Sequence, residues 1–198
     1  MIVAVAEAAR RLEQGDVIAY PTETVYGLGA DARSPGALAR LCELKGRDPT
    51  RGMSVLVADA AALERCAPGL PARARQLARR FWPGPLTLVV PLDDPALAAV
   101  ATERGVGFRC SPQPTAQALV RAARCPVVST SANRSGEPPA RDAAGVATCF
   151  GDDLPVAGGE PAGGLEPSTV VAVAADGHID LLREGALPWR TLAEELHA

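Results

Sequence analysis

Short apolar segments alternate with helical patterns along most of this 198-residue chain. The apolar segments have the length of buried strands, and they lie at residues 17–20, 53–57, 86–91, 105–110 and 126–128. The helical patterns between and after them lie at residues 4–14, 35–45, 72–82, 115–123 and 142–150, with a last one from Pro188. Such alternation predicts helices packed on a sheet that contains parallel strands.

The end of the chain breaks this alternation. Residues 168–174 and 178–183 flank Asp176-Gly177, which is a strong signal for a two-residue β-hairpin. A hairpin is antiparallel, so we expect a layered α/β domain (α+β in formal classes) with a mixed parallel/antiparallel sheet flanked by helices. The length favours one domain over residues 1–198, and the glycine-rich segment 158–164 is the candidate for a mobile lid.

Charge and cysteine content exclude several classes of function. The net charge is −3, so the chain lacks the overall basic character of a nucleic-acid-binding protein. Five scattered cysteines and two histidines give no zinc pattern, and we predict no protein-bound metal. No apolar stretch approaches the ~20 residues that cross a bilayer. We therefore expect a cytoplasmic protein without a membrane partner.

Two residue types occur only once. Lys45 is the single lysine among 20 basic residues, and Asn133 is the single asparagine. The chain is rich in Ala, Arg, Gly and Pro, which are encoded by GC-rich codons. Such a codon bias favours arginine over lysine at most cationic positions. A lysine that is retained despite this bias indicates a position where a compact ammonium suits better than a planar guanidinium. The alternative is that the single lysine and the single asparagine occur by chance.

Polar side chains cluster in three segments, two of which contain Lys45 and Asn133. Residues 21–24 (P-T-E-T) bring the hydroxyls of Thr22 and Thr24 to a strand end, and the glycines that follow permit a close ligand. Lys45, Arg47 and Arg51 form a cationic group that suits a polyphosphate. Residues 129–133 (S-T-S-A-N) place hydroxyls and an amide after an apolar strand, where ligands bind in open α/β sheets. The alternatives are an ordinary turn for residues 21–24, compensation of a helix C-terminal dipole for the cations, and a helix cap with a turn for residues 129–133.

Two more positions join these clusters at predicted strand ends. Arg109 lies at the end of the segment 105–110, and we expect the closing hairpin to bring Arg183 near Ser168. A solvated surface charge is the alternative for each arginine. No P-loop, G-x-G-x-x-G or G-x-S-x-G motif is present, and both histidines lie outside the clusters. A pocket of hydroxyls and cations suits anions and nucleotides, and reactions that need positioning and charge neutralisation.

Taken together, these clusters closely resemble the YrdC-like threonylcarbamoyl-AMP synthase family in its short bacterial (TsaC-type) form. The matching stretches run in family order, at residues 20–29, 43–47, 82–87, 126–136, 167–171 and 182–185. The resemblance implies a YrdC-like twisted mixed sheet. It also implies an enzyme, a nucleotidyltransferase that joins L-threonine, bicarbonate and ATP into threonylcarbamoyl-AMP and pyrophosphate for threonylcarbamoyladenosine modification of tRNA.

The resemblance also implies roles for particular residues. The ATP side takes Lys45, Arg47, Ser131, Asn133 and Arg183, with Lys45 and Arg47 favoured for charge stabilisation. The threonine and bicarbonate side takes Thr22, Thr24, Arg109, Ser129 and Ser168. The two sets can be partly exchanged, and the role of Glu23, the carboxylate of the P-T-E-T segment, is open. Mg²⁺ is expected to arrive with ATP, and tRNA and the threonylcarbamoyl-transfer proteins are expected as transient partners.

Four positions depart from the family pattern. Arg51 and Leu56 stand where long relatives tend to have asparagine and histidine, although Arg51-Gly52 fits the short form. Gly105 replaces a usual serine or threonine, which puts one nucleotide contact in doubt, and Gln113 replaces a common histidine.

Two other classes of protein remain as alternatives. One is a non-catalytic module that binds double-stranded RNA or tRNA, although the net acidic chain shows no pattern of stacking aromatic residues. The other is the carbamoyl-adenylate enzyme of hydrogenase-maturation proteins, which carry additional domains for which this chain has no room.

Overall fold

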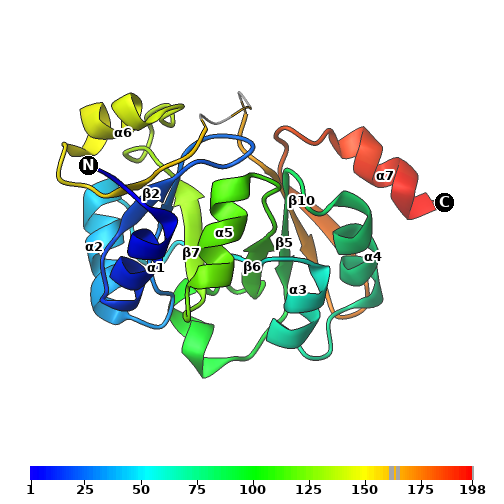
Figure 1. The fold of residues 1–198 in the computed structure, drawn as a ribbon. Helices are drawn as coiled ribbons and strands as arrows, with labels where there is room; N and C mark the ends of the chain where they lie inside the picture. Colours follow the sequence, from blue (N-terminus) through cyan, green and yellow to red (C-terminus); the bar gives the residue numbers. More distant parts are fainter. Residues whose placement is uncertain (161–162, 164–165, 198) are drawn as a thin grey trace.

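The computed structural model describes residues 1–160, 163 and 166–197, and its centre is one mixed sheet (Figure 1). The strand order across the sheet is β1-β8-β2-β3-β7-β4-β6-β5-β9-β10. In chain order the strands are β1 (Ile2–Val3), β2 (Ile18–Tyr20), β3 (Gly27–Gly29), β4 (Ser54–Leu56), β5 (Leu86–Val90), β6 (Val106–Arg109), β7 (Val127–Ser131), β8 (Val156–Ala157), β9 (Thr169–Val173) and β10 (Ile179–Arg183).

Helices surround this sheet. They are α1 (Val5–Glu13), α2 (Pro35–Lys45), α3 (Ala60–Cys66), α4 (Ala72–Phe81), α5 (Pro114–Ala122), α6 (Ala143–Phe150) and α7 (Trp189–His197), with a 3₁₀ helix η1 (Pro95–Val100). Figure 1 shows α1 near one end of the sheet and α7 beyond the other end, next to the C-terminus. Among the described residues, no helix is long and apolar enough to cross a membrane.

The pairing confirms the predicted mixed sheet. Parallel pairs join β1 to β8, β2 to β8, β4 to β6 and β5 to β9. Antiparallel pairs make the remaining contacts, including the predicted closing hairpin of β9 and β10. The predicted helices and strands are all present, with ends that differ by a few residues at most.

The turn of the closing hairpin differs from the prediction. Ile179 pairs with Val173, so three residues, 175–177, form the loop rather than two. The Gly177 amide donates to the Ala174 carbonyl, and Gly177 then takes a positive φ of 88°. This geometry is a tight turn followed by a left-handed residue, the usual three-residue hairpin. Asp-Gly therefore indicated the hairpin correctly but not its loop length.

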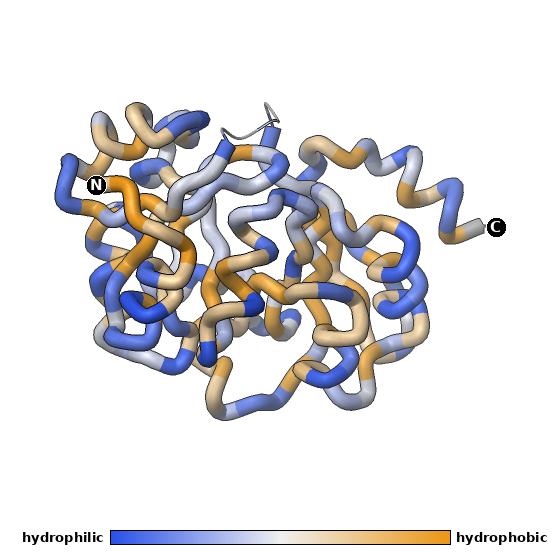
Figure 2. Tube along the Cα trace, viewed as in Figure 1, coloured by the Kyte–Doolittle hydropathy of each residue, from blue (hydrophilic) through white to orange (hydrophobic). Residues whose placement is uncertain are grey.

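The strands present alternate side chains to two packed faces. On one face, Ile18, Tyr20 and Val127 join buried residues of α1 and α5 in one cluster. On the other face, a larger cluster includes Leu28, Val128 and buried residues of α2, α3, α4 and α7. Figure 2 shows the hydrophobic positions gathered along the central strands and the hydrophilic positions mainly on peripheral loops and outer helix surfaces. Burial on both faces explains the continuous apolar runs that marked these strands.

Five elements were not expected from the sequence: β1, β3, β8, α3 and η1. The strand β3 lies in the segment that we interpreted as a turn with glycines for a close ligand. An added Cβ at Gly27 or Gly29 would lie 3.0 or 3.1 Å from ring carbons of Tyr20. These glycines therefore let β3 pack against the fully buried Tyr20 ring, which is a structural reason for both.

The predicted lid segment is only partly described, because residues 161–162 and 164 lie outside the described residues. Its first part is anchored: the Thr115 hydroxyl donates to the Gly158 carbonyl at 3.1 Å. At Gly159, a Cβ would lie 2.0 Å from that hydroxyl oxygen, so a side chain does not fit.

Candidate active site

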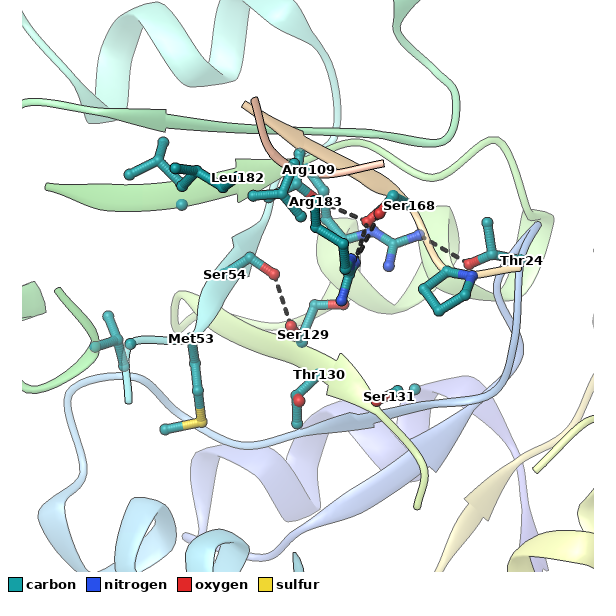
Figure 3. Close-up of a pocket in the computed structure, with 18 of the residues that line it drawn as sticks. Thr24, Met53, Ser54, Arg109, Ser129, Thr130, Ser131, Ser168, Leu182 and Arg183 are labelled. Carbon is teal, nitrogen blue, oxygen red and sulfur yellow. Dashed lines mark hydrogen bonds between the residues drawn. The ribbon is translucent and has the colours of Figure 1, made fainter. Parts of the chain in front are cut away.

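A cavity of about 290 Å³ opens on the same sheet face as α1 and α5, over strands that these two helices do not cover (Figure 3). Its floor consists of small residues whose side chains share that face. Gly27 pairs with Ser131, Ser54 pairs with both Ser129 and Gly107, and these register positions keep large side chains out. The hollow therefore follows from strand alternation, which turns apolar neighbours such as Val55 and Phe108 into the core.

Most of the predicted site residues line this cavity. They come from the loop before β3, from the loop after α2 and from β6, β7 and the closing hairpin: Thr24, Arg47, Arg109, Ser129, Ser131, Ser168 and Arg183. Three further predicted residues, Thr22, Lys45 and Asn133, lie behind this lining. The structure thus brings together segments that are up to about 160 residues apart in the chain.

The cavity carries concentrated positive charge. Arg47, Arg109 and Arg183 line it, and its described lining includes no aspartate or glutamate. Partial burial lowers the pKa of Arg183, and the charges of Arg109 and Arg47 lower it further. The three guanidinium groups therefore repel one another in a partly desolvated space, and a bound anion would relieve that repulsion.

Arg109 is held by the P-T-E-T segment. Its Nη2 donates to Glu23 Oε1 at 2.7 Å and to the Thr24 hydroxyl at 3.4 Å. The Thr22 hydroxyl lies 3.1 Å from that of Thr24 and donates to the Val25 carbonyl at 2.6 Å. Thr22 therefore fixes the turn that presents Thr24, rather than facing the cavity itself.

Arg47 is positioned by the end of α2. Gly46 takes a positive φ of 55° and ends the helix, and the Arg47 amide donates to the Cys42 carbonyl at 3.0 Å. The Arg47 guanidinium then donates to the Gly52 carbonyl at 2.7 Å. Burial lowers the pKa of Arg47, with a smaller effect from Arg51. The predicted third cation, Arg51, is exposed and does not line the cavity.

Arg183 and Ser168 form the wall opposite β7. Arg183 Nη2 donates to the Ser168 carbonyl at 2.7 Å, as we expected from the hairpin. The Ser168 hydroxyl lies 2.9 Å from the Thr87 hydroxyl, which comes from the neighbouring strand β5. A register shift in β10 at residues 181–183 turns Leu182 toward the cavity as well.

The single lysine supports the cavity from behind. The Lys45 ammonium donates to the main-chain oxygens of Ser131 and Asn133, and to Asn133 Oδ1 at 3.4 Å. The Lys45 pKa is lowered to about 8, mainly by burial and secondarily by the charge of Arg47. Asn133 Oδ1 also accepts from the Ser131 hydroxyl, so Lys45 and Asn133 together fix the end of β7.

Several buried polar atoms of this region have no hydrogen-bond partner among the described residues. They are Nε of Arg47, Nε of Arg109, the Ser129 hydroxyl and the Tyr20 hydroxyl. A buried polar atom without a partner is costly, and three of these four belong to residues that line the cavity. Their grouping at one place distinguishes this cavity from a simple packing defect.

The positions that depart from the family pattern have local explanations. Gly105 has a φ of 109°, and a Cβ there would lie 2.0 Å from the Val90 carbonyl oxygen. Leu56 is buried against α1 and α5. The Gln113 side chain caps α5, because its Oε1 accepts from the Ala116 amide at 3.1 Å. Gly105, Leu56 and Gln113 therefore each have a role in the fold.

Some lining residues were not predicted as site residues, among them Ser54, Thr87, Gly107 and Thr130. The signal for Ser54 and Thr87 is a lone polar residue in an otherwise apolar strand. The register between strands is needed to show that Ser54 and Thr87 lie on the same face of the sheet. This register cannot be read from the sequence of a single strand.

The arrangement can bind anions through charge and hydroxyl groups without a metal cage. Among the described residues, no three His, Cys, Asp or Glu side chains are grouped as a metal site.

Comparison with known proteins agrees with this geometry. Residues 10–185 match the Sua5/YciO/YrdC family model, described as "Telomere recombination". The Threonylcarbamoyl-AMP synthase of Chromohalobacter salexigens is 41% identical over 167 residues, covering 84% of this chain and 90% of that protein. The Threonylcarbamoyl-AMP synthase of Bacillus subtilis is 39% identical over 186 residues, covering 92% of this chain but 54% of that protein.

A solved structure extends the similarity to three dimensions. The crystal structure of P. abyssi Sua5 complexed with L-threonine matches with a TM-score of 0.87 and 32% identity. The match covers 99% of this chain and 61% of the Sua5 chain, so this chain spans about six tenths of that relative. By sequence, motif order and fold, the chain belongs to the Sua5/YciO/YrdC family.

Proposed function

We propose that this protein is an L-threonylcarbamoyladenylate synthase. It condenses L-threonine, bicarbonate and ATP into threonylcarbamoyl-AMP, with release of pyrophosphate and water. The observation that carries the proposal is the convergence of Arg47, Arg109 and Arg183 on one cavity whose described lining contains no carboxylate. Each of the three substrates has a negatively charged group, and the names of relatives that match most of this chain support this reaction.

The ATP side of the cavity is assigned to Arg47, Ser131 and Arg183. Arg47 and Arg183 have guanidinium groups that can bind phosphate oxygens in pairs. Lys45 and Asn133 belong to this side through their hold on Ser131, since both lie behind the lining. They act by keeping the end of β7 in one position.

The threonine side is assigned to Thr24, Arg109, Ser129 and Ser168, with Thr22 as the support of Thr24. A guanidinium suits the carboxylate of an amino acid, and neighbouring hydroxyls suit its polar side chain. A solved structure of Sua5, which shares this fold, is a complex with L-threonine, and this supports an amino-acid site in this protein.

The chemistry needs charge neutralisation more than a strong nucleophile. Threonine and bicarbonate form an N-carboxylated threonine, whose new carboxylate attacks the α-phosphate of ATP, and pyrophosphate leaves. Carboxylate and triphosphate repel each other, so fixed cations that contact both groups lower the barrier. Holding both reactants in one cavity also removes the entropic cost of their encounter.

Other substrates and partners follow from the same proposal. Mg²⁺ arrives with ATP and supplies further neutralisation of the phosphates. The product is passed to threonylcarbamoyl-transfer proteins that modify tRNA. We place this reaction in the cytoplasm, where ATP and tRNA are available and where thiols such as those of Cys42 and Cys110 stay reduced.

Pyrophosphate release tests the proposal. The protein is incubated with ATP, Mg²⁺, threonine and bicarbonate, and pyrophosphate is measured with each component omitted in turn. We expect release only when threonine and bicarbonate are both present. Release that persists without either one would show that the assigned reaction is wrong.

A further inference from the structure

Glu23 is the carboxylate of the P-T-E-T segment, and the chemistry described above gives it no task. Its side chain is 14% exposed, and both of its oxygens are engaged. Oε1 accepts from Arg109 Nη2 at 2.7 Å, and Oε2 accepts from the hydroxyl of Ser111. A carboxylate that is held on both oxygens is poorly placed to remove a proton from a substrate.

Ser111 is itself fixed by the start of α5. Its hydroxyl oxygen accepts from the Gln113 amide at 3.2 Å, and its carbonyl accepts from Gln117 Nε2 at 2.7 Å. Ser111 is 1% exposed and is not a lining residue of the cavity. A continuous set of hydrogen bonds therefore runs from a rigid helix end through Ser111 and Glu23 to Arg109.

These hydrogen bonds determine which N–H groups of Arg109 remain available to a ligand in the cavity. Nη2 is used by Glu23 and Thr24, whereas Nε and Nη1 make no hydrogen bond to any described residue. Two partners on Nη2 restrict the rotation of the planar guanidinium, and this sets the direction of its other donors. An unanchored arginine would instead lose the entropy of several rotatable bonds on binding.

We infer that Glu23 and Ser111 are positioning residues that fix Arg109 for the carboxylate of the amino-acid substrate. This inference rests on the proposed function, because it assumes that Arg109 binds threonine. It assigns a role to Ser111, which lies outside the motifs read from the sequence, and it removes Glu23 from the candidates for a general base.

The test measures threonine affinity by calorimetry, together with separate KM values for threonine and ATP. The variants are Glu23→Gln, Ser111→Ala and the double variant, with exposed Glu103→Gln as the matched control. We expect each single variant to weaken threonine binding about tenfold or more, in line with the loss of a hydrogen bond to a charged group. We expect the KM for ATP to change less than about twofold, and the Glu103→Gln control to match wild type.

The energetic coupling between the Glu23 and Ser111 variants gives a second readout, which a general loss of stability would not produce. Because both residues act through Arg109, the double variant should weaken binding no more than the stronger single variant. The variant Ser111→Thr keeps the hydroxyl and should restore most of the affinity lost in Ser111→Ala. If Glu23→Gln does not fold, the Ser111 variants carry the test alone.

Three results would overturn the inference. A large fall in kcat with unchanged threonine affinity would make Glu23 a base. Tighter threonine binding in Glu23→Gln would mean that Glu23 merely competes with the ligand for Arg109. Lower thermal stability with both affinities unchanged would leave only a structural role. A wild-type protein without threonine affinity would instead refute the proposed function, and this inference with it.

Discussion

The Lys45 ammonium donates a hydrogen bond of 2.9 Å to the main-chain oxygen of Asn133, so the only lysine of the chain holds the only asparagine. Lys45 is 2% exposed, and its ammonium also donates to the Ser131 carbonyl. A compact ammonium fits between these oxygens, whereas a planar guanidinium is larger and directs its donors differently. The contact therefore predicts that arginine cannot replace lysine at this position.

Replacing Lys45 by arginine tests this explanation. We expect Lys45→Arg to lower kcat/KM for ATP at least tenfold, because the larger group displaces the end of β7 together with Ser131. Overpacking should also lower the free energy of unfolding by about 1–3 kcal/mol. Steady-state kinetics and urea denaturation measure both effects. The exposed residue Arg40 on the same helix gives the reverse swap as a control, and Arg40→Lys should change neither quantity.

Burial of Lys45 predicts a particular pH dependence of stability. Its pKa falls from the ordinary 10.5 to about 8, mainly through desolvation. Between these values the unfolded chain keeps a proton that the folded protein has lost, so stability rises with pH. Relative to Lys45→Met, the wild-type free energy of unfolding should increase between pH 8 and 10.5 by up to about 1.4 kcal/mol per pH unit. A difference that stays constant or falls over this range would contradict the buried ammonium.

The two sides of the cavity should respond separately to loss of charge. We expect Arg47→Ala to raise the KM for ATP about tenfold or more and Arg109→Ala to do the same for threonine, because each removes a charged hydrogen-bond donor. Each should affect the other substrate's KM much less. The exposed Arg134→Ala serves as a control. If both variants raise the same KM, the division of the site between ATP and threonine is wrong.

Two glycines offer a matched test of the packing beneath the cavity. At Gly27 a Cβ would lie 3.0 Å from Tyr20 Cζ, so Gly27→Ala should lower the free energy of unfolding by about 1–3 kcal/mol. At Gly36, in the first turn of α2, a Cβ would meet no described atom within 4 Å. Gly36→Ala should therefore stabilise the protein by up to about 1 kcal/mol. Equal effects in urea denaturation would argue against the close contact with Tyr20.

Long apolar runs and capped helices were readable from the sequence because their signals are local. Ser34 accepts from the Ala37 amide at 3.3 Å, and Gly46 ends the same helix in a left-handed conformation, both as expected. The short strands β1 and β8 have two residues each and carry no such signal. The strand β3 consists of G-L-G, which reads as a turn until the Tyr20 ring is placed over it.

The residues of the site were predictable from the sequence, but it was not predictable which of them line the cavity and which lie behind it. Lys45 and Arg47 were assigned together, yet Gly46 turns the chain between them, so that Arg47 lines the cavity and Lys45 lies behind it. Ser111 gave no signal, because its partner Glu23 is 88 residues away. Contacts of this length depend on the whole sheet being formed, and local patterns do not contain them.

Direct identification of the product tests the central claim most closely. The protein is supplied with ATP, Mg²⁺, threonine and ¹³C-labelled bicarbonate, and the mixture is examined at once by mass spectrometry. We predict an adenylate that contains both threonine and one labelled carbon. An adenylate without the label, or conversion of ATP that yields no threonine-containing nucleotide, would contradict the assignment of this cavity to threonylcarbamoyl-AMP synthesis.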